Sequence, residues 1–201
     1  MAGPRRSGGA GRGGATGRQR PWGWHQLDAQ WARRLVAEAH IGPGDLVLDI
    51  GAGHGVITAE LLAVGARVIA VERHSARLDA LRERFGGEVT VVAADASELR
   101  LPRRPFKVVA NPPFAVTSSL LRRLLQPGTR LISADLVLQD AAARRWSAPD
   151  APGAGRWHRT HRARAAVTVP PSAFTPPPRV SCRILQVRPT RGHPALSVRR
   201  G

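Results

Sequence analysis

Sulfur and lysine are scarce in this chain of 201 residues. Cys182 is the single cysteine, so an internal disulfide is impossible and a cysteine-based zinc site is disfavoured. Lys107 is the single lysine among 31 basic residues. His158 and His161 lie in an arginine-rich stretch without cysteine or acidic neighbours, and we interpret them as solvated. We therefore expect no metal site.

Long apolar runs are also missing. A membrane span needs about 18 consecutive apolar residues, and the sequence contains no such run. The first 21 residues hold five arginines and seven glycines but no apolar segment of a secretory signal. We expect a cytoplasmic protein. We predict disordered tails at residues 1–21 and 189–201 around one folded domain at residues 22–188.

Acidic residues are few and unevenly placed. The chain has 14 of them, which leaves a net charge of +17. From Ala96 onward four acids face 19 basic residues. Such an excess favours polyanions, and nucleic acid is the usual one. The distribution suggests a near-neutral half for a small molecule and a basic half for phosphate.

Segments of strand and helix character alternate through the middle of the chain. Asp28 is a plausible N-cap for a first helix with Trp31 and Leu35 on its apolar side. The predicted strands are residues 46–50, 67–71, 89–93, 106–110 and 131–138, and the later helices are residues 56–63, 75–85, 117–125 and 139–146. This alternation predicts an α/β, Rossmann-like, doubly wound fold with a mostly parallel sheet.

The last third of the chain is less regular. Residues 147–164 show no periodicity, and we predict an arginine-rich loop that Trp157 anchors. Residues 165–169 and 180–187 then read as two strands around a proline-rich turn. Two late strands joined in this way predict an antiparallel hairpin at one edge of the sheet.

A glycine-rich turn follows the first predicted strand. Gly51, Gly53 and Gly55 allow tight turning and close approach of the backbone to a ligand. Glu72 ends the second strand, where a carboxylate can bind both ribose hydroxyls, and Asp95 after the third can accept from an adenine amino group. Position 56 is not the glycine of NAD-binding loops, and no P-loop motif occurs. The pattern indicates S-adenosylmethionine as cofactor.

The fourth predicted strand runs into Asn111-Pro112-Pro113-Phe114. The prolines stiffen the turn, so the Asn111 side-chain oxygen and a proline carbonyl can both accept from one exocyclic NH₂ group. Phe114 offers a face on which a planar base can stack. We predict Asn111, Pro112 and Phe114 as the catalytic set for methyl transfer to a planar amine. The motif alone does not distinguish adenine from cytosine or from a glutamine side chain.

These motifs resemble the Erm and dimethyladenosine transferase family of ribosomal RNA adenine N6-methyltransferases. The similarity covers residues 22–188. It rests on D-I-G-A-G-H-G (49–55), V-E (71–72), A-D-A (94–96), V-V-A-N-P-P-F (108–114), L-V-L-Q-D-A-A-A-R (136–144) and F-T-P-P-P-R-V-S (174–181).

The resemblance implies a class I fold with a mostly parallel seven-stranded sheet. The cofactor-binding residues that it implies or supports are His25, Leu27, Gly51, Gly53, Glu72, Asp95, Ala96 and Asn111. The W-G-W-H start and the R-P-F run favour the Erm branch, which methylates 23S rRNA and gives resistance to macrolide, lincosamide and streptogramin antibiotics. We expect a monomer. We also expect a short member of the family, because the family's C-terminal helical domain has no counterpart after residue 188.

Three alternatives stay open. The first is the 16S branch of dimethyladenosine transferases, since both branches share the motifs. A DNA adenine or protein glutamine methyltransferase fits the N-P-P-F turn but not the two later motifs. A non-catalytic RNA-binding factor with the same fold would be separated from an enzyme by measuring cofactor binding.

Overall fold

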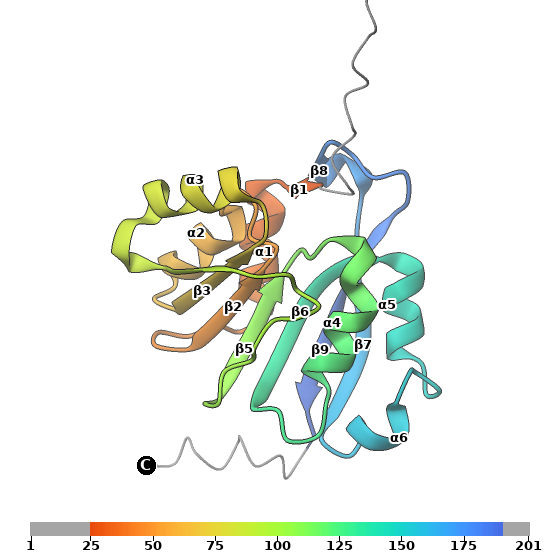
Figure 1. Ribbon diagram of the computed structural model, residues 1–201. Coiled ribbons are helices and arrows are strands. Elements are labelled where there is room, and N and C mark those ends of the chain that lie inside the picture. The colour runs from red at the N-terminus through yellow and green to blue at the C-terminus, as the bar shows by residue number, and fades with distance from the viewer. Residues whose placement is uncertain (1–24, 191–201) are drawn as a thin grey trace, which may run out of the picture.

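Seven strands form one sheet in the order β4-β3-β2-β5-β6-β9-β7 in a computed structural model that describes residues 25–190 (Figure 1). The pairs from β4 to β6 are parallel, and β9 is antiparallel to both β6 and β7. The prediction of a mostly parallel seven-stranded sheet with a late antiparallel pair is therefore confirmed. The two predicted tails lie outside the described residues, except for the first residues of the second.

The element bounds follow the predicted alternation closely. The strands are β1 (Gln26–Leu27), β2 (Leu46–Ile50), β3 (Arg67–Glu72), β4 (Thr90–Ala93), β5 (Phe106–Ala110), β6 (Leu131–Gln139), β7 (His161–Val169), β8 (Phe174–Thr175) and β9 (Cys182–Pro189). The α-helices are α1 (Ala29–Glu38), α2 (Val56–Ala63), α3 (Ser75–Phe85), α4 (Thr117–Leu124), α5 (Asp140–Ser147) and α6 (Ala154–Trp157). Short 3₁₀ turns are η1 (Gly86–Glu88), η2 (Phe114–Val116) and η3 (Pro171–Ala173).

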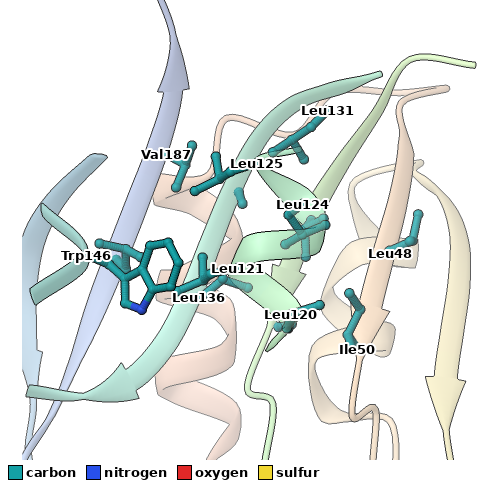
Figure 2. Close-up of a cluster of buried hydrophobic side chains, with 14 of the residues drawn as sticks. Leu48, Ile50, Leu120, Leu121, Leu124, Leu125, Leu131, Leu136, Trp146 and Val187 are labelled. Atoms are coloured by element: carbon teal, nitrogen blue, oxygen red, sulfur yellow. The ribbon is translucent and has the colours of Figure 1, made fainter. Parts of the chain in front are cut away.

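Two layers of helices cover the sheet. Every residue of β2 and β5 is buried, as expected for parallel strands between two helical layers. On the back face, α1, α2 and α3 pack against the sheet in one apolar cluster. On the front face, the leucines of α4 and Trp146 of α5 fill a second cluster (Figure 2). Asp28 caps α1 as predicted, because its carboxylate accepts from the Trp31 backbone N–H over 2.7 Å.

The prediction of an arginine-rich loop over residues 147–164 was wrong in part. Residues 154–157 form α6, and β7 already begins at His161. His161 is buried rather than solvated, and its Nε2 lies 3.2 Å from the Leu131 carbonyl oxygen. Trp157 anchors this segment as expected, since it is buried and donates from Nε1 to the Pro152 oxygen over 3.1 Å.

The chain also forms a two-stranded sheet that was not predicted. Leu27 of β1 pairs with Phe174 of β8, so the segment before α1 is bound to the proline-rich turn. Among residues 25–190, no helix has the length and apolar character needed to cross a membrane. The same residues contain no cluster of three or more side chains suited to a metal ion.

Candidate active site

The glycine turn and the N-P-P-F turn meet where the strand order reverses. The chain moves from β2 outward to β4 and then returns to β5, so β2 and β5 flank the switch point at which α/β sheets bind ligands. Gly51 has φ +80°, and a Cβ on it would lie 3.1 Å from Pro113 Cδ and 3.4 Å from the backbone oxygen of Asn111. Glycine is thus needed both for the backbone conformation and for the close approach.

Glu72 is a buried carboxylate at the end of β3. Its Oε2 accepts from the Gly53 N–H over 3.0 Å, and its Oε1 accepts from the Arg73 and His74 N–H groups over 2.9 Å each. Arg77 of α3 places Nη1 3.6 Å from Oε1. These partners fix the carboxylate beside the glycine turn, in the position expected for a ribose acceptor.

Asp95 follows β4 and is held by its own turn. Its Oδ1 accepts from the backbone N–H and the hydroxyl of Ser97, over 2.8 and 2.7 Å, and its Oδ2 accepts from Arg73 over 3.0 Å. The hydrogen bonds from Ser97, with a smaller contribution from Arg73, lower the pKa of Asp95. The carboxylate is therefore charged at neutral pH and can act as an acceptor.

Asn111 has a fixed orientation at the end of β5. Its Nδ2 donates to the His25 backbone oxygen over 2.7 Å. Because the amide nitrogen is engaged there, the side-chain oxygen on the other side of the amide is the atom left for a substrate. The His25 ring in turn donates from Nδ1 to the Pro176 oxygen over 2.7 Å and stacks on Phe114 with 5.5 Å between ring centroids.

Most of the predicted site residues come together. One hollow is lined by His25, Gly51, Glu72, Asn111, Pro112 and Phe114, together with Arg77 and Pro113. Gly53 joins it through its hydrogen bond to Glu72, whereas Asp95 and the buried Ala96 lie at the neighbouring strand end. Leu27 does not face the hollow with the others; it is buried in the back-face cluster.

Arg73 and Arg77 belong to the site, although sequence reasoning did not select them. Arg73 links the ends of β3 and β4 through Asp95, and Arg77 lies in the first turn of the helix after Glu72. Their place immediately after the acidic strand end was the available signal. Neither arginine fits a motif, and an arginine in the first turn of a helix is otherwise read as solvated.

Asp49 of β2 is a buried carboxylate that contacts the helix after the glycine turn. Its Oδ2 accepts from the Thr58 hydroxyl of α2 over 2.6 Å. Its Oδ1 is buried without a hydrogen-bond partner. Burial raises the pKa of this carboxyl to about 7.

The geometry fits S-adenosylmethionine. The glycine turn lets the backbone pack directly against the N-P-P-F turn, and the carboxylates of Glu72 and Asp95 follow at the ends of the next two strands, where they can accept from a ribose and an adenine. A profile described as "Ribosomal RNA adenine dimethylase" matches residues 26–200. The chain belongs to this family. It is a family of enzymes, and the resemblance found in the motifs is confirmed.

Individual relatives agree with this assignment. A ribosomal RNA small subunit methyltransferase A from Sphingopyxis alaskensis is 38% identical over 194 residues, which cover 86% of this chain and 69% of the relative. An rRNA adenine N-6-methyltransferase from Bacteroides fragilis is 30% identical over 81% of this chain and 63% of its own length. The chain thus spans about two thirds of the length of these relatives.

Solved structures show the same architecture. The 23S rRNA methyltransferase ErmE superposes with a TM-score of 0.73 at 27% identity, over 84% of this chain and 71% of that chain. A dimethyladenosine transferase from Plasmodium falciparum gives 0.72 at 25% identity, over 83% and 64%. The fold is that of a class I S-adenosylmethionine-dependent methyltransferase.

Proposed function

We propose that this chain transfers a methyl group from S-adenosylmethionine to the N6 amino group of an adenine in ribosomal RNA. The observation that carries the proposal is the orientation of Asn111. Its Nδ2 is bound to the His25 oxygen, so its side-chain oxygen is left to accept from a substrate amine at the switch point. Phe114, three residues further on, supplies a face for the base.

The chemistry needs positioning more than a strong base. The lone pair of an aromatic amine is delocalised into the ring, and hydrogen bonds from both of its N–H groups favour a pyramidal nitrogen with a lone pair that can attack. The Asn111 oxygen and the Pro112 carbonyl are suited to accept those bonds. Bound S-adenosylmethionine supplies an activated methyl group on a sulfonium centre. The proton of the amine can leave after the methyl group has been transferred.

The cofactor-binding residues follow from the same geometry. Glu72 would bind the ribose hydroxyls and Asp95 the adenine amino group, with Ala96 beside it. Gly51 and Gly53 would let the backbone approach the cofactor, and His25 and Asn111 would close the site beside the methyl group. Leu27 would contribute indirectly, because its buried side chain holds the segment that carries His25.

We propose 23S rRNA as the substrate, with antibiotic resistance as the consequence. The fold similarity to ErmE and the R-P-F run before the N-P-P-F turn support this choice. The identity of 38% to a small subunit methyltransferase favours 16S rRNA as a second candidate. We further propose that the protein acts as a monomer in the cytoplasm without a metal ion.

Radiolabelled S-adenosylmethionine with purified 23S and 16S rRNA tests these proposals. Label in 23S rRNA that is lost in Asn111→Ala would support the favoured substrate, and expression in a susceptible host should then raise the inhibitory concentration of a macrolide. Label in 16S rRNA alone would assign the second candidate. No label in either RNA, with cofactor still bound, would contradict the proposed activity.

Phe114→Leu is expected to lower kcat/KM for rRNA about tenfold. Stacking of a base on an aromatic ring contributes roughly 1–3 kcal/mol, and leucine keeps apolar contact but loses the flat face. Phe114→Tyr keeps the ring and should stay within about threefold of the wild type. Steady-state methyl transfer at varied RNA concentration measures both variants. Equal losses in the two variants would show that stacking is not the role of this ring.

Arg77→Met is expected to raise the Kd for S-adenosylmethionine about fivefold. The Arg77–Glu72 contact is mostly shielded from solvent but spans 3.6 Å, so its loss should cost about 1 kcal/mol of cofactor binding. Isothermal titration calorimetry measures the Kd. Arg82→Met on the same helix, whose partner Asp79 is exposed, serves as the matched control. An equal change in both variants would argue against a positioning role for Arg77.

A further inference from the structure

A groove on the front face of the sheet lies outside the candidate active site. The connection from β4 to β5, residues 94–105, contains no helix, although such crossovers usually carry one. Figure 1 shows this connection on the front side of the sheet, beside α4. It leaves a groove of about 550 Å³ over the start of these strands. The groove is lined by Leu46, Leu48, Ile69, Val92, Leu99, Arg100, Pro102, Arg103 and Arg104.

The wall of the groove is held in place. Arg123 of α4 donates from Nε to the Leu99 oxygen over 2.6 Å, and its two other nitrogens lie 3.4 Å from the oxygens of Ser97 and Glu98. The Leu99 side chain is buried in the front-face cluster. Because one buried side chain and one arginine fix the connection, the groove exists without a ligand to shape it.

The floor and the rim of the groove have different chemistry. The strands contribute an apolar floor, whereas Arg100, Arg103 and Arg104 are exposed on the rim. None of these three arginines takes part in the ion pairs found among residues 25–190, and no acidic side chain lines the groove. A surface of this kind complements a polyanion that also carries flat apolar groups.

The chain's own ends do not complement it. Residues 1–24 contain five arginines and residues 191–201 contain three, and neither segment has an acidic residue. Both segments would bring positive charge to a positive rim. The charge therefore favours a separate, negatively charged partner over either end of this chain.

We propose that this groove binds a single-stranded segment of the RNA substrate, with phosphates on the arginines and a base against the apolar floor. The identity of the polymer as rRNA rests on the proposed function. Single strands fit because their unstacked bases are free to reach an apolar surface, whereas paired bases in a duplex are not. The rim arginines precede β5 and Asn111 follows it, so the length of this strand, about 17 Å, lies between them, a distance that a few nucleotides span.

The test compares two double variants that remove the same charge. Arg103→Ala/Arg104→Ala alters the groove. Arg156→Ala/Arg159→Ala alters exposed arginines in and after α6, which lies near β7, away from β2 and β3 (Figure 1). The probe is a fluorescent single-stranded oligoribonucleotide, with the matching duplex and polyphosphate as competitors. Fluorescence anisotropy at several salt concentrations gives the Kd, and cofactor affinity and thermal unfolding verify that each variant is folded.

We expect the groove variant to bind the single strand at least about tenfold more weakly at 0.1 M salt. The slope of log Kd against log salt concentration should decrease by about 1.4, since two phosphate contacts on a single strand are lost. The α6 variant should bind as the wild type does, and duplex and polyphosphate should compete poorly. Equal weakening in both variants, no weakening in either, or effective competition by polyphosphate would each overturn the groove as a specific site.

The assay separates this proposal from the proposed function. Wild-type protein that binds the oligoribonucleotide through the groove but methylates neither rRNA would overturn the function and leave the groove. If the wild-type protein methylates rRNA and the groove variant does so with an unchanged KM, the groove proposal is overturned and the proposed function stands.

Discussion

Replacing Asn111 with alanine should lower the rate of methyl transfer by about 10²–10³-fold at saturating rRNA and cofactor. This side chain is an acceptor with a fixed orientation, because the His25 backbone oxygen accepts from its nitrogen over 2.7 Å. Removing one preorganised polar group at a reacting centre typically has an effect of this size. Single-turnover transfer of labelled methyl groups measures the chemical step without product release.

Asn111→Asp provides the control for this prediction. Aspartate keeps an oxygen toward the substrate but puts a second oxygen against the His25 carbonyl, in place of the donated hydrogen bond. It should therefore lose nearly as much activity as alanine, although the acceptor remains. Cofactor binding should stay within about tenfold in both variants, because Glu72 and Asp95 are untouched. Full activity in Asn111→Asp would contradict the orienting role assigned to His25.

The folded core was predictable because its elements carry strong patterns. In β2, β3 and β5, apolar runs end in residues with distinct chemistry, namely Gly51, Glu72 and Asn111. In parallel strands these ends gather at one edge of the sheet, so their chain order was enough to place them in one site. The same argument placed Asp95, since β4 lies next to β3.

The edge of the sheet was harder to predict because its inward residues are weakly apolar. In β7, exposed Arg162 and Arg164 alternate with the more buried His161, Ala163 and Ala165. Alternation is present, but alanine and histidine do not mark a buried face, so residues 161–164 were predicted as loop and only residues 165–169 as a strand. Pairing with β9 decides the conformation, with Arg162 opposite Arg188 and Ala163 opposite Val187. Such pairing is a tertiary effect that local sequence does not encode.

The contacts around His25 could not be predicted for a related reason. They depend on the pairing of β1 with β8, two strands of two residues each that lie far apart in the sequence. Strands so short have no detectable period. The stack of His25 on Phe114 and the bond from His25 to Pro176 follow only once that pairing exists.

The free energy of unfolding should fall as pH rises from 4 to 7 because of Asp49. In the unfolded chain this carboxyl has its ordinary pKa of 3.8, whereas burial raises the pKa to about 7 in the folded protein. Between these pH values the folded state holds a proton that the unfolded state has released, so the contribution of Asp49 to stability is greatest below pH 4 and is lost as the pH rises to 7. Three pKa units correspond to a loss on the order of 4 kcal/mol.

Asp49→Asn isolates this contribution. Asparagine can still accept a hydrogen bond from the Thr58 hydroxyl but cannot ionise. As the pH rises from 4.5 to 8, the variant should therefore lose less stability than the wild type. Asp135, whose pKa burial also raises, contributes with the same sign in both proteins. The difference between the two proteins therefore reports Asp49 alone, and urea unfolding at several pH values measures it. The exposed Asp150→Asn should follow the wild type. Parallel curves for the wild type and Asp49→Asn would mean that the folded protein keeps this carboxylate charged despite its burial.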